Sequence, residues 1–178
     1  MGRFKTKRLL RILLLAPVAL AVNLLITIVF VYFVFVLDMY VNTDRLSEVS
    51  YPLELYCGNV ARYYKFTKGP VVFRVDRGTL VYRLNPYVSG GNLLGYAPFF
   101  IFPHHRTVIL SEEAIKGAHL DVLVAHELGH IQGGLASFGT VRELEIYAND
   151  FAKEIFGNER FNLYLKYLEE LSTKEPPK

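Results

Sequence analysis

The sequence contains one segment whose residue types and spacing could do chemistry, His126-Glu127-Leu128-Gly129-His130. It lies in a run of Leu, Val and Ala that is typical of an α-helix, on which residues four apart share one face with Cβ atoms about 6 Å apart. The imidazoles of His126 and His130 could then both reach one Zn²⁺ at roughly 2.0–2.1 Å. Glu127 lies one step round the helix, where it could accept a proton from a water molecule at the metal. The spacing therefore predicts a metal site that activates water.

The same residues could also be ordinary members of an amphipathic helix, so a further ligand is needed to decide. A catalytic zinc takes three protein ligands and keeps one position open. Residues 141–156 are typical of a second helix, on which Glu143 and Glu145 point to nearly opposite sides. Glu145 falls on the edge of the apolar face, where a carboxylate is costly unless a cation meets it. We predict Glu145 as the third ligand, and an ion pair with Arg142 or Arg160 is its alternative.

Other polar side chains near these helices have weaker claims to a role. Asn149 lies one turn after Glu145 on the same side, so it could hydrogen-bond a liganding histidine or Glu145 itself; a surface hydrogen bond is the alternative. His119 shares a face with His126 but lies about 10 Å along the axis, too far to share a metal with His130. Candidates to stabilise a negatively charged intermediate, among which the sequence does not choose, are Arg142, Arg160, Tyr164 and Tyr167.

The distribution of charge and cysteine excludes some classes of function. The net charge is +3, but residues 1–11 contain five Lys and Arg and no acid, which leaves −2 for the remainder. A mildly acidic body without a basic stripe argues against a nucleic-acid partner. Cys57 is the only cysteine, which excludes an intramolecular disulfide and a cysteine-based zinc site.

The N-terminal region predicts a membrane anchor. Residues 12–37 form 26 consecutive residues without a charge, about 39 Å as a helix against a hydrocarbon core of about 30 Å. The basic residues before this span predict a cytoplasmic N-terminus, which places the domain after Asp38 outside the cytoplasm, held at the cell membrane by a single pass. One alternative is a signal peptide cleaved near Ala19-Leu20-Ala21. The other is a hairpin of two half-helices within residues 9–37, which would reverse the orientation.

After the span, the pattern predicts a polar connector over residues 38–51 and a helix over residues 52–66. Residues 71–76 and 79–84 are rich in β-forming residues around Asp76-Arg77-Gly78, which predicts a β-hairpin. The next stretch, residues 85–92, is rich in Gly, Pro and Asn and predicts a loop. Residues 93–102 fit either an edge strand or a buried loop, and residues 107–110 predict a short strand.

Helices follow the strands. Ser111 is typical of an N-cap for a short helix that ends near Gly117, and a long helix over residues 120–132 carries the histidines. Thr140 and Glu143 form a capping-box pattern that opens the next helix. Gly157 ends that helix, and a last amphipathic helix follows. The predicted fold class is α+β: a single transmembrane helix, then a small domain with a short mixed sheet, an active-site helix and a third-ligand helix.

The residues from Thr107 to Ile115 and from His119 to Ile131 resemble the strand, short helix and active-site helix of gluzincin metallopeptidases. The nearest type is the HtpX and CAAX-prenyl-endopeptidase family, including the one-domain minigluzincins, and Glu145 to Ala152 is similar to its Glu-x-x-Ala-Asp segment. The resemblance covers about residues 70–157. It implies a zincin-like domain with Zn²⁺ on His126, His130 and Glu145, Glu127 as general base, and an edge strand that binds an extended peptide.

Two features depart from that family pattern. Asn149 stands where the family usually has Asp, and the several membrane spans of HtpX are absent, so substrate range and membrane side do not carry over. Within this resemblance the chain divides into residues 1–37 as basic N-terminus and anchor, residues 38–68 as connector and helix, and residues 69–178 as a metallopeptidase-like domain. Residues 93–102 are the expected substrate-binding element.

The predicted function is a membrane-anchored zinc endopeptidase that acts on a peptide or protein substrate, and the sequence specifies no protein partner. One alternative is a membrane-anchored binding or scaffold protein with a structural or inert metal site. A closed structural site would need a fourth ligand, for which His119 and His104 are the candidates. A latent protease, with residues 159–178 lying over the cleft, is a further alternative.

Overall fold

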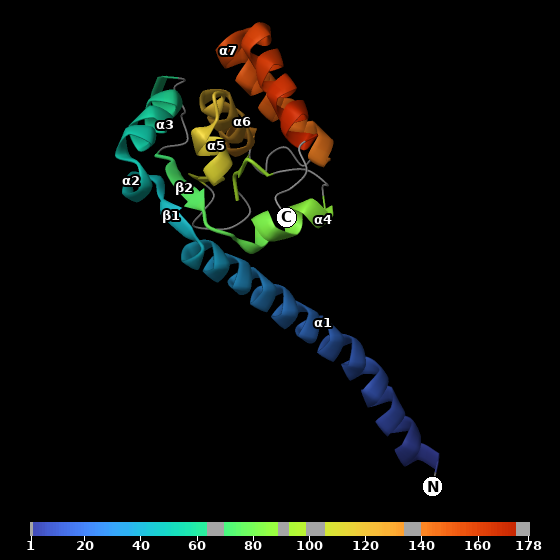
Figure 1. The fold of residues 1–178 in the computed structure, drawn as a ribbon. Helices are drawn as coiled ribbons and strands as arrows, with labels where there is room; N and C mark the ends of the chain where they lie inside the picture. Colours follow the sequence, from blue (N-terminus) through green and yellow to red (C-terminus); the bar gives the residue numbers. More distant parts are fainter. Residues whose placement is uncertain (1, 64–69, 89–92, 99–105, 134–139, 174–178) are drawn as a thin grey trace. The chain divides into compact units, whose positions relative to one another are not determined.

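The computed structural model describes residues 2–63, 70–88, 93–98, 106–133 and 140–173, and for residues 2–15 it describes the backbone alone. The chain divides into two compact units, Met1–Asp38 and Met39–Lys178, and Figure 1 shows its elements. The second unit combines helices with a small four-stranded sheet. The predicted α+β class is therefore confirmed, and residues 39–63 fold together with the histidine-bearing helix.

The first unit is a single long helix. α1 (Gly2–Val41) is continuous and includes Pro17, and its part from Ala16 to Val41 is long and apolar enough to cross a membrane. Its large apolar side chains are exposed, Leu20 at 72% and Phe30 at 66%. Exposed apolar surface of this kind is costly in water and favourable in a lipid core. The helix has the length and composition predicted for residues 12–37.

The sheet has the strand order β1-β2-β4-β3. β2 (Val72–Asp76) runs parallel to the central strand β4 (Thr107–Leu110), while β1 (Thr43–Arg45) and β3 (Gly95–Tyr96) pair antiparallel at the two edges. All four residues of β4 are buried, as a central strand covered on both faces requires. The strand predicted at residues 107–110 is confirmed, and the ambiguous segment forms an edge strand at Gly95–Tyr96; residues 99–102 lie outside the described residues.

The β-hairpin predicted around Asp76-Arg77-Gly78 is wrong, although its first strand, predicted over residues 71–76, is confirmed as β2. The second predicted strand is instead part of the helix α4 (Leu80–Val88), which also takes in the first residues of the predicted loop at 85–92. The Asp76 carboxylate accepts hydrogen bonds from the Gly78 N–H at 2.6 Å and the Thr79 N–H at 2.9 Å. Thr79 Oγ1 then accepts the Tyr82 N–H at 3.2 Å. These bonds cap a helix, so the chain turns into α4 where β-propensity alone favoured a strand.

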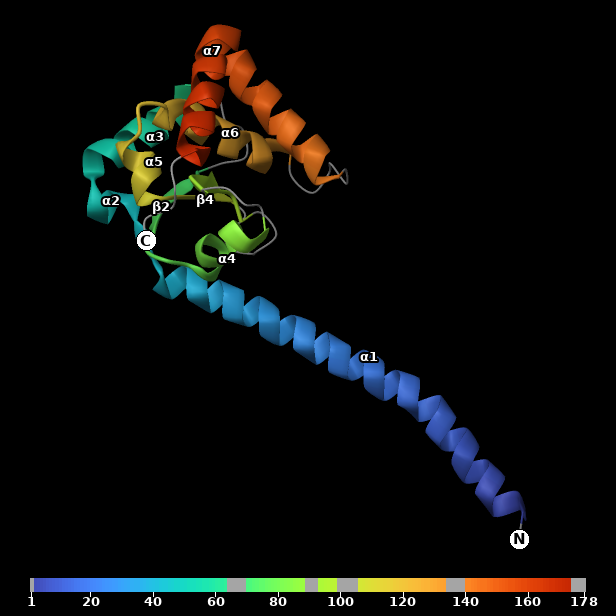
Figure 2. The ribbon, with the colours of Figure 1, turned by 45° about the vertical axis from the view of Figure 1, so that its right-hand side comes forward.

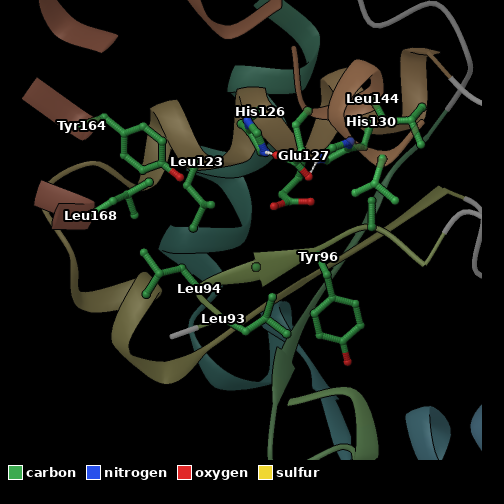
Figure 3. A pocket seen from close by; sticks show the side chains of 14 residues that line it. Leu93, Leu94, Tyr96, Leu123, His126, Glu127, His130, Leu144, Tyr164 and Leu168 are labelled. Atoms are coloured by element: carbon green, nitrogen blue, oxygen red, sulfur yellow. Dashed lines mark hydrogen bonds and ion pairs between the residues drawn. The ribbon is translucent and has the colours of Figure 1, made fainter. Parts of the chain in front are cut away.

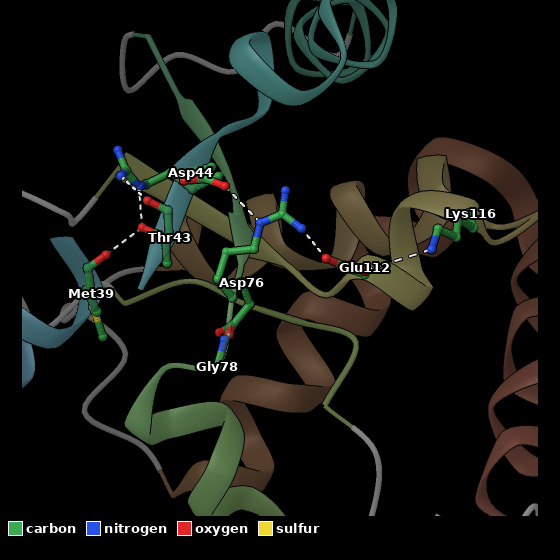
Figure 4. A network of polar contacts seen from close by, with 9 residues as sticks. Met39, Thr43, Asp44, Asp76, Gly78, Glu112 and Lys116 are labelled. Carbon is green, nitrogen blue, oxygen red and sulfur yellow. Dashed lines mark hydrogen bonds and ion pairs between the residues drawn. The ribbon is translucent and has the colours of Figure 1, made fainter. Parts of the chain in front are cut away.

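The polar connector predicted at residues 38–51 is also wrong, because it contains strand β1 and the one-turn helix α2 (Leu46–Val49). The polar residues pair within the fold: the Arg74 guanidinium donates from Nε to Thr43 Oγ1 at 2.5 Å and from Nη2 to Thr43 O at 2.6 Å (Figure 4). Leu46 is fully buried. α3 (Tyr51–Tyr63) follows as the predicted helix.

The remaining helices begin and end where the sequence signals predicted. Ser111 caps α5 (Glu112–Lys116) by accepting the Ala114 N–H at 3.0 Å. The capping box of Thr140 and Glu143 opens α7 (Val141–Ser172), which breaks at Gly157, where φ is 77°. Figures 1 and 2 both show α6 (Leu120–Gly133) between the sheet and α7. The core of this unit therefore surrounds α6.

Candidate metal centre

The helix α6 carries the histidine motif and is buried along most of its length. Val122, Val124 and Ala125 have no exposed surface, and Leu123 and Leu128 are nearly as enclosed. A mainly apolar helix is stable in water only when most of its surface is buried, and burying each Leu or Val contributes roughly 1.5–3 kcal/mol. The motif is thus held on the helix with the most buried residues among those described.

The helix α7, which carries Glu145, packs closely against α6 at Gly129. A Cβ added at Gly129 would lie 2.8 Å from Ala148 Cα, closer than carbon atoms can approach, and 3.1 Å from Phe151 Cβ. Gly129 therefore allows the backbones of α6 and α7 to touch one turn from Glu145. This close approach is what brings a short carboxylate side chain within reach of the imidazoles on α6.

Three side chains from these two helices meet at one point. His126 Nε2 lies 3.1 Å from His130 Nε2, and the Glu145 carboxylate has Oε2 3.4 Å from His126 Nε2 and Oε1 3.4 Å from His130 Nε2. Both imidazoles are 11% exposed, whereas Glu145 is half exposed. The structure thus brings together the three predicted ligands as a group that could hold a metal ion.

Hydrogen bonds and charge interactions link the carboxylate of Glu145 to the imidazoles of His126 and His130. Hydrogen bonds from His126 and His130 hold the pKa of Glu145 far below its usual range, against the opposing effect of burial. Burial lowers the pKa of His126, but Glu145, the charge of Glu127 and a hydrogen bond with Asn149 together raise it above its ordinary value. Asn149 therefore lies close to His126, whose Nδ1 has no hydrogen-bond partner within the described part of the chain.

Glu127 points from α6 into the space below the histidines (Figure 3). It is 4% exposed, and burial raises the pKa of its carboxyl above the ordinary value, while His126, His130 and the Ala97 N–H oppose that change. Its Oε2 has no hydrogen-bond partner within the described part of the chain. A buried carboxylate with one oxygen available and a raised pKa is suited to take up a proton.

A cavity of about 550 Å³ opens beside the cluster. Strand β3 forms part of its wall, and a Cβ added at Gly95 would lie 3.4 Å from Glu127 Oε1. Both ends of α7 contribute, because Tyr164 and Leu168 from the part after Gly157 also line it. Most of the other lining residues are apolar: Leu93, Leu94, Ala97, Leu123, Val141 and Leu144.

The other residues singled out by type are distributed differently. Of the four candidates for stabilising a negative charge, Tyr164 lines the cavity and Arg160 forms an ion pair with Asp121. The ring of Tyr167 packs against that of His119, with centroids 5.3 Å apart. Tyr167 and His119 therefore do not belong to the cluster of His126, His130 and Glu145. Arg142 lies exposed in the first turn of α7.

His104, the other candidate for a fourth ligand, lies outside the described residues.

Sequence reasoning missed the contribution of the strand β3. The Ala97 N–H hydrogen-bonds Glu127, and a Cβ added at Gly95 would lie 3.4 Å from Glu127 Oε1. Proximity of this kind depends on the backbone and leaves no mark on residue type beyond the small size of these two side chains. The Gly-Tyr-Ala run inside an apolar segment was the available signal, because Gly in a strand often marks a close approach.

Comparison of the chain with protein-family models, with curated proteins and with solved structures found no match.

Proposed function

We propose that this chain is a membrane-anchored, zinc-dependent endopeptidase of the gluzincin type, with a zincin-like domain. The observation that carries the proposal is the meeting of His126 and His130 from one helix with Glu145 from another, beside the buried carboxylate of Glu127. A His₂Glu donor set with a neighbouring Glu is the arrangement of a hydrolytic zinc site.

The separation of the donor atoms supports zinc as the metal. Bonds of about 2.0–2.2 Å in a tetrahedral arrangement place neighbouring ligand atoms about 3.3 Å apart. The measured separations are 3.1 Å between the two Nε2 atoms and 3.4 Å from each to the nearer Glu145 oxygen. Imidazole and carboxylate are both zinc ligands, so the residues fit the ion in type and spacing.

When bound, Zn²⁺ would polarise the scissile carbonyl and lower the pKa of water to about 7. His126, His130 and Glu145 would hold the ion, and Asn149 lies beside His126. Glu127 takes a proton from the attacking water on its carboxylate and later donates it to the leaving amine. The apolar wall of the cavity limits bulk water around that carboxylate.

The substrate would be a peptide or protein in extended form. β3 is an edge strand of the sheet and lies beside Glu127. This position suits an extended peptide that pairs with the sheet edge. The neighbouring cavity is large enough for a side chain and mainly apolar. We expect cleavage next to an apolar residue, which a set of peptides varying at that position would test; equal cleavage of charged and apolar variants would contradict it.

A structural metal in a scaffold protein would need a fourth protein ligand. Within the part of the chain that the structure describes, the group consists of three residues, and His119 packs against Tyr167 instead. The described geometry therefore favours an open coordination position, as catalysis requires.

The deciding experiment compares hydrolysis of casein by the purified full-length protein with that by Glu127→Gln. Loss of a general base lowers kcat by about 10²–10⁴-fold, and zinc content should stay at the wild-type level. Glu154→Gln, an exposed glutamate on α7, is the matched control and should hydrolyse casein normally. Equal activity of Glu127→Gln and wild type would reject the peptidase, and zinc bound without any hydrolysis by the wild type would favour the scaffold.

A further inference from the structure

The strand β3 is too short to hold its own position. It consists of Gly95 and Tyr96 and pairs with β4 over these two residues, whereas strands in folded proteins usually have five or six residues. Yet this segment lies against Glu127: the Ala97 N–H, just beyond the strand, hydrogen-bonds the carboxylate, and a Cβ added at Gly95 would lie 3.4 Å from Glu127 Oε1. The two-residue ladder therefore needs support from further contacts.

The side chain of Tyr96 supplies that support. Its ring points away from Glu127, toward the other face of the sheet (Figure 3), as the alternation of side chains along a strand requires. There its hydroxyl lies 2.8 Å from Thr79 Oγ1 and 3.1 Å from Asp76 Oδ2. Tyr96, which lies between Gly95 and Ala97, is thus tied to a point on the opposite side of β3.

The anchor point is itself buried and fully hydrogen-bonded. Thr79 is 0% and Asp76 5% exposed, and Thr79 Oγ1–H donates to Asp76 Oδ2 at 2.6 Å. Asp76 Oδ1 accepts the N–H groups of Gly78 (Figure 4) and Thr79. A carboxylate held by this many donors is a rigid, charge-assisted acceptor, so the Tyr96 O–H has a fixed partner.

We propose that Tyr96 is a positioning residue: its hydrogen bonds to Thr79 and Asp76 hold strand β3 against Glu127, and so fix the carboxylate that handles the proton. The inference rests on the proposed peptidase function. It does not involve the metal ligands, because Tyr96 touches neither histidine nor Glu145 among the contacts that define the cluster. Loss of the Tyr96 hydroxyl should therefore lower the rate of catalysis and leave metal binding unchanged.

The test measures kcat, KM and zinc content of the full-length Tyr96→Phe protein. A hydrogen bond to a charged group supports a change of about tenfold to a hundredfold, so kcat should fall by about that factor, more than KM rises, while zinc content stays at the wild-type level. Thr79→Val should behave alike, and Thr79→Ser, which keeps the hydroxyl, should retain activity. Tyr51→Phe removes an exposed tyrosine hydroxyl and is the matched control.

Unchanged kcat in Tyr96→Phe would overturn the inference, and so would a parallel loss of zinc and activity, which signals general destabilisation. Amide hydrogen exchange over residues 95–97 gives a readout independent of turnover: exchange should be faster in Tyr96→Phe than in wild type. If the wild type hydrolyses nothing, the proposed function fails. The anchoring of β3 is then judged by exchange alone, and equal rates in the two proteins would reject it.

Discussion

Tyr164 is the residue, among the four candidates for oxyanion stabilisation, whose side chain lines the cavity. Burial raises the pKa of its phenol, and the charges of Glu127 and Glu145 raise it further. The hydroxyl therefore keeps its proton at neutral pH and is available as a hydrogen-bond donor. Figure 3 shows it directed into the cavity near Leu123.

We expect Tyr164→Phe to lower kcat by about 10²–10³-fold, the effect of removing one oxyanion donor, with zinc content unchanged. Steady-state peptide hydrolysis measures the effect. Tyr147→Phe removes a hydroxyl from a more exposed tyrosine on the same helix and should be neutral. Wild-type kcat in Tyr164→Phe would leave the tyrosine with a packing role only.

At the scale of elements, the contact between α6 and α7 decides whether a metal site exists. Gly129 lies against Ala148 with no space for a methyl group. Gly129→Ala should push the helices apart, cost about 1–3 kcal/mol of unfolding free energy and weaken zinc binding. Gly58→Ala is the matched control, because its added Cβ meets nothing within 4 Å and alanine favours a helix by about 0.5–1 kcal/mol.

Chemical unfolding and zinc titration of both full-length variants would check this pair. If Gly129→Ala binds zinc as tightly as Gly58→Ala does, then the backbone contact between α6 and α7 is not what brings Glu145 to the histidines.

The elements that the sequence predicted well are those with local signals. Ser111, the Thr140–Glu143 capping box and Gly157 act within a few residues of themselves, so the helix boundaries that depend on them were predictable. The His126–His130 spacing is equally local, because one helical turn sets it.

The elements that failed have two different causes. The hairpin at Asp76 was wrong because Asp76 and Thr79 cap α4 through hydrogen bonds within three residues, a local signal that the β-forming composition concealed. Tyr96, twenty residues from Asp76, adds a long-range bond to the same carboxylate. Strand β1 was missed because Thr43 pairs with Arg74, thirty-one residues away.

At the scale of the whole molecule, the apolar helix and the charge distribution lead to a proposal about location. The part of α1 from Ala16 to Val41 is long and apolar enough to cross a membrane, and the five basic residues that precede this part are expected to stay in the cytoplasm. We propose a single-pass protein of the cell membrane with residues 39–178 on the extracytoplasmic side.

Labelling of introduced cysteines with a membrane-impermeant maleimide in intact cells tests this orientation. Tyr51→Cys, at a residue 62% exposed, should be labelled, and Gly2→Cys should be labelled only after lysis. The parent protein gives the background, because its one cysteine, Cys57, is buried. The opposite labelling pattern would place the peptidase domain in the cytoplasm.

The central claim is that two imidazoles and one carboxylate from separate helices hold a single metal ion. Metal analysis of the purified full-length protein after dialysis against buffered zinc tests it most directly, with Glu145→Ala beside the exposed control Glu154→Ala. We expect about one zinc per chain in wild type and Glu154→Ala, and little in Glu145→Ala. Equal zinc in Glu145→Ala and wild type, or none in the wild type, would contradict the account.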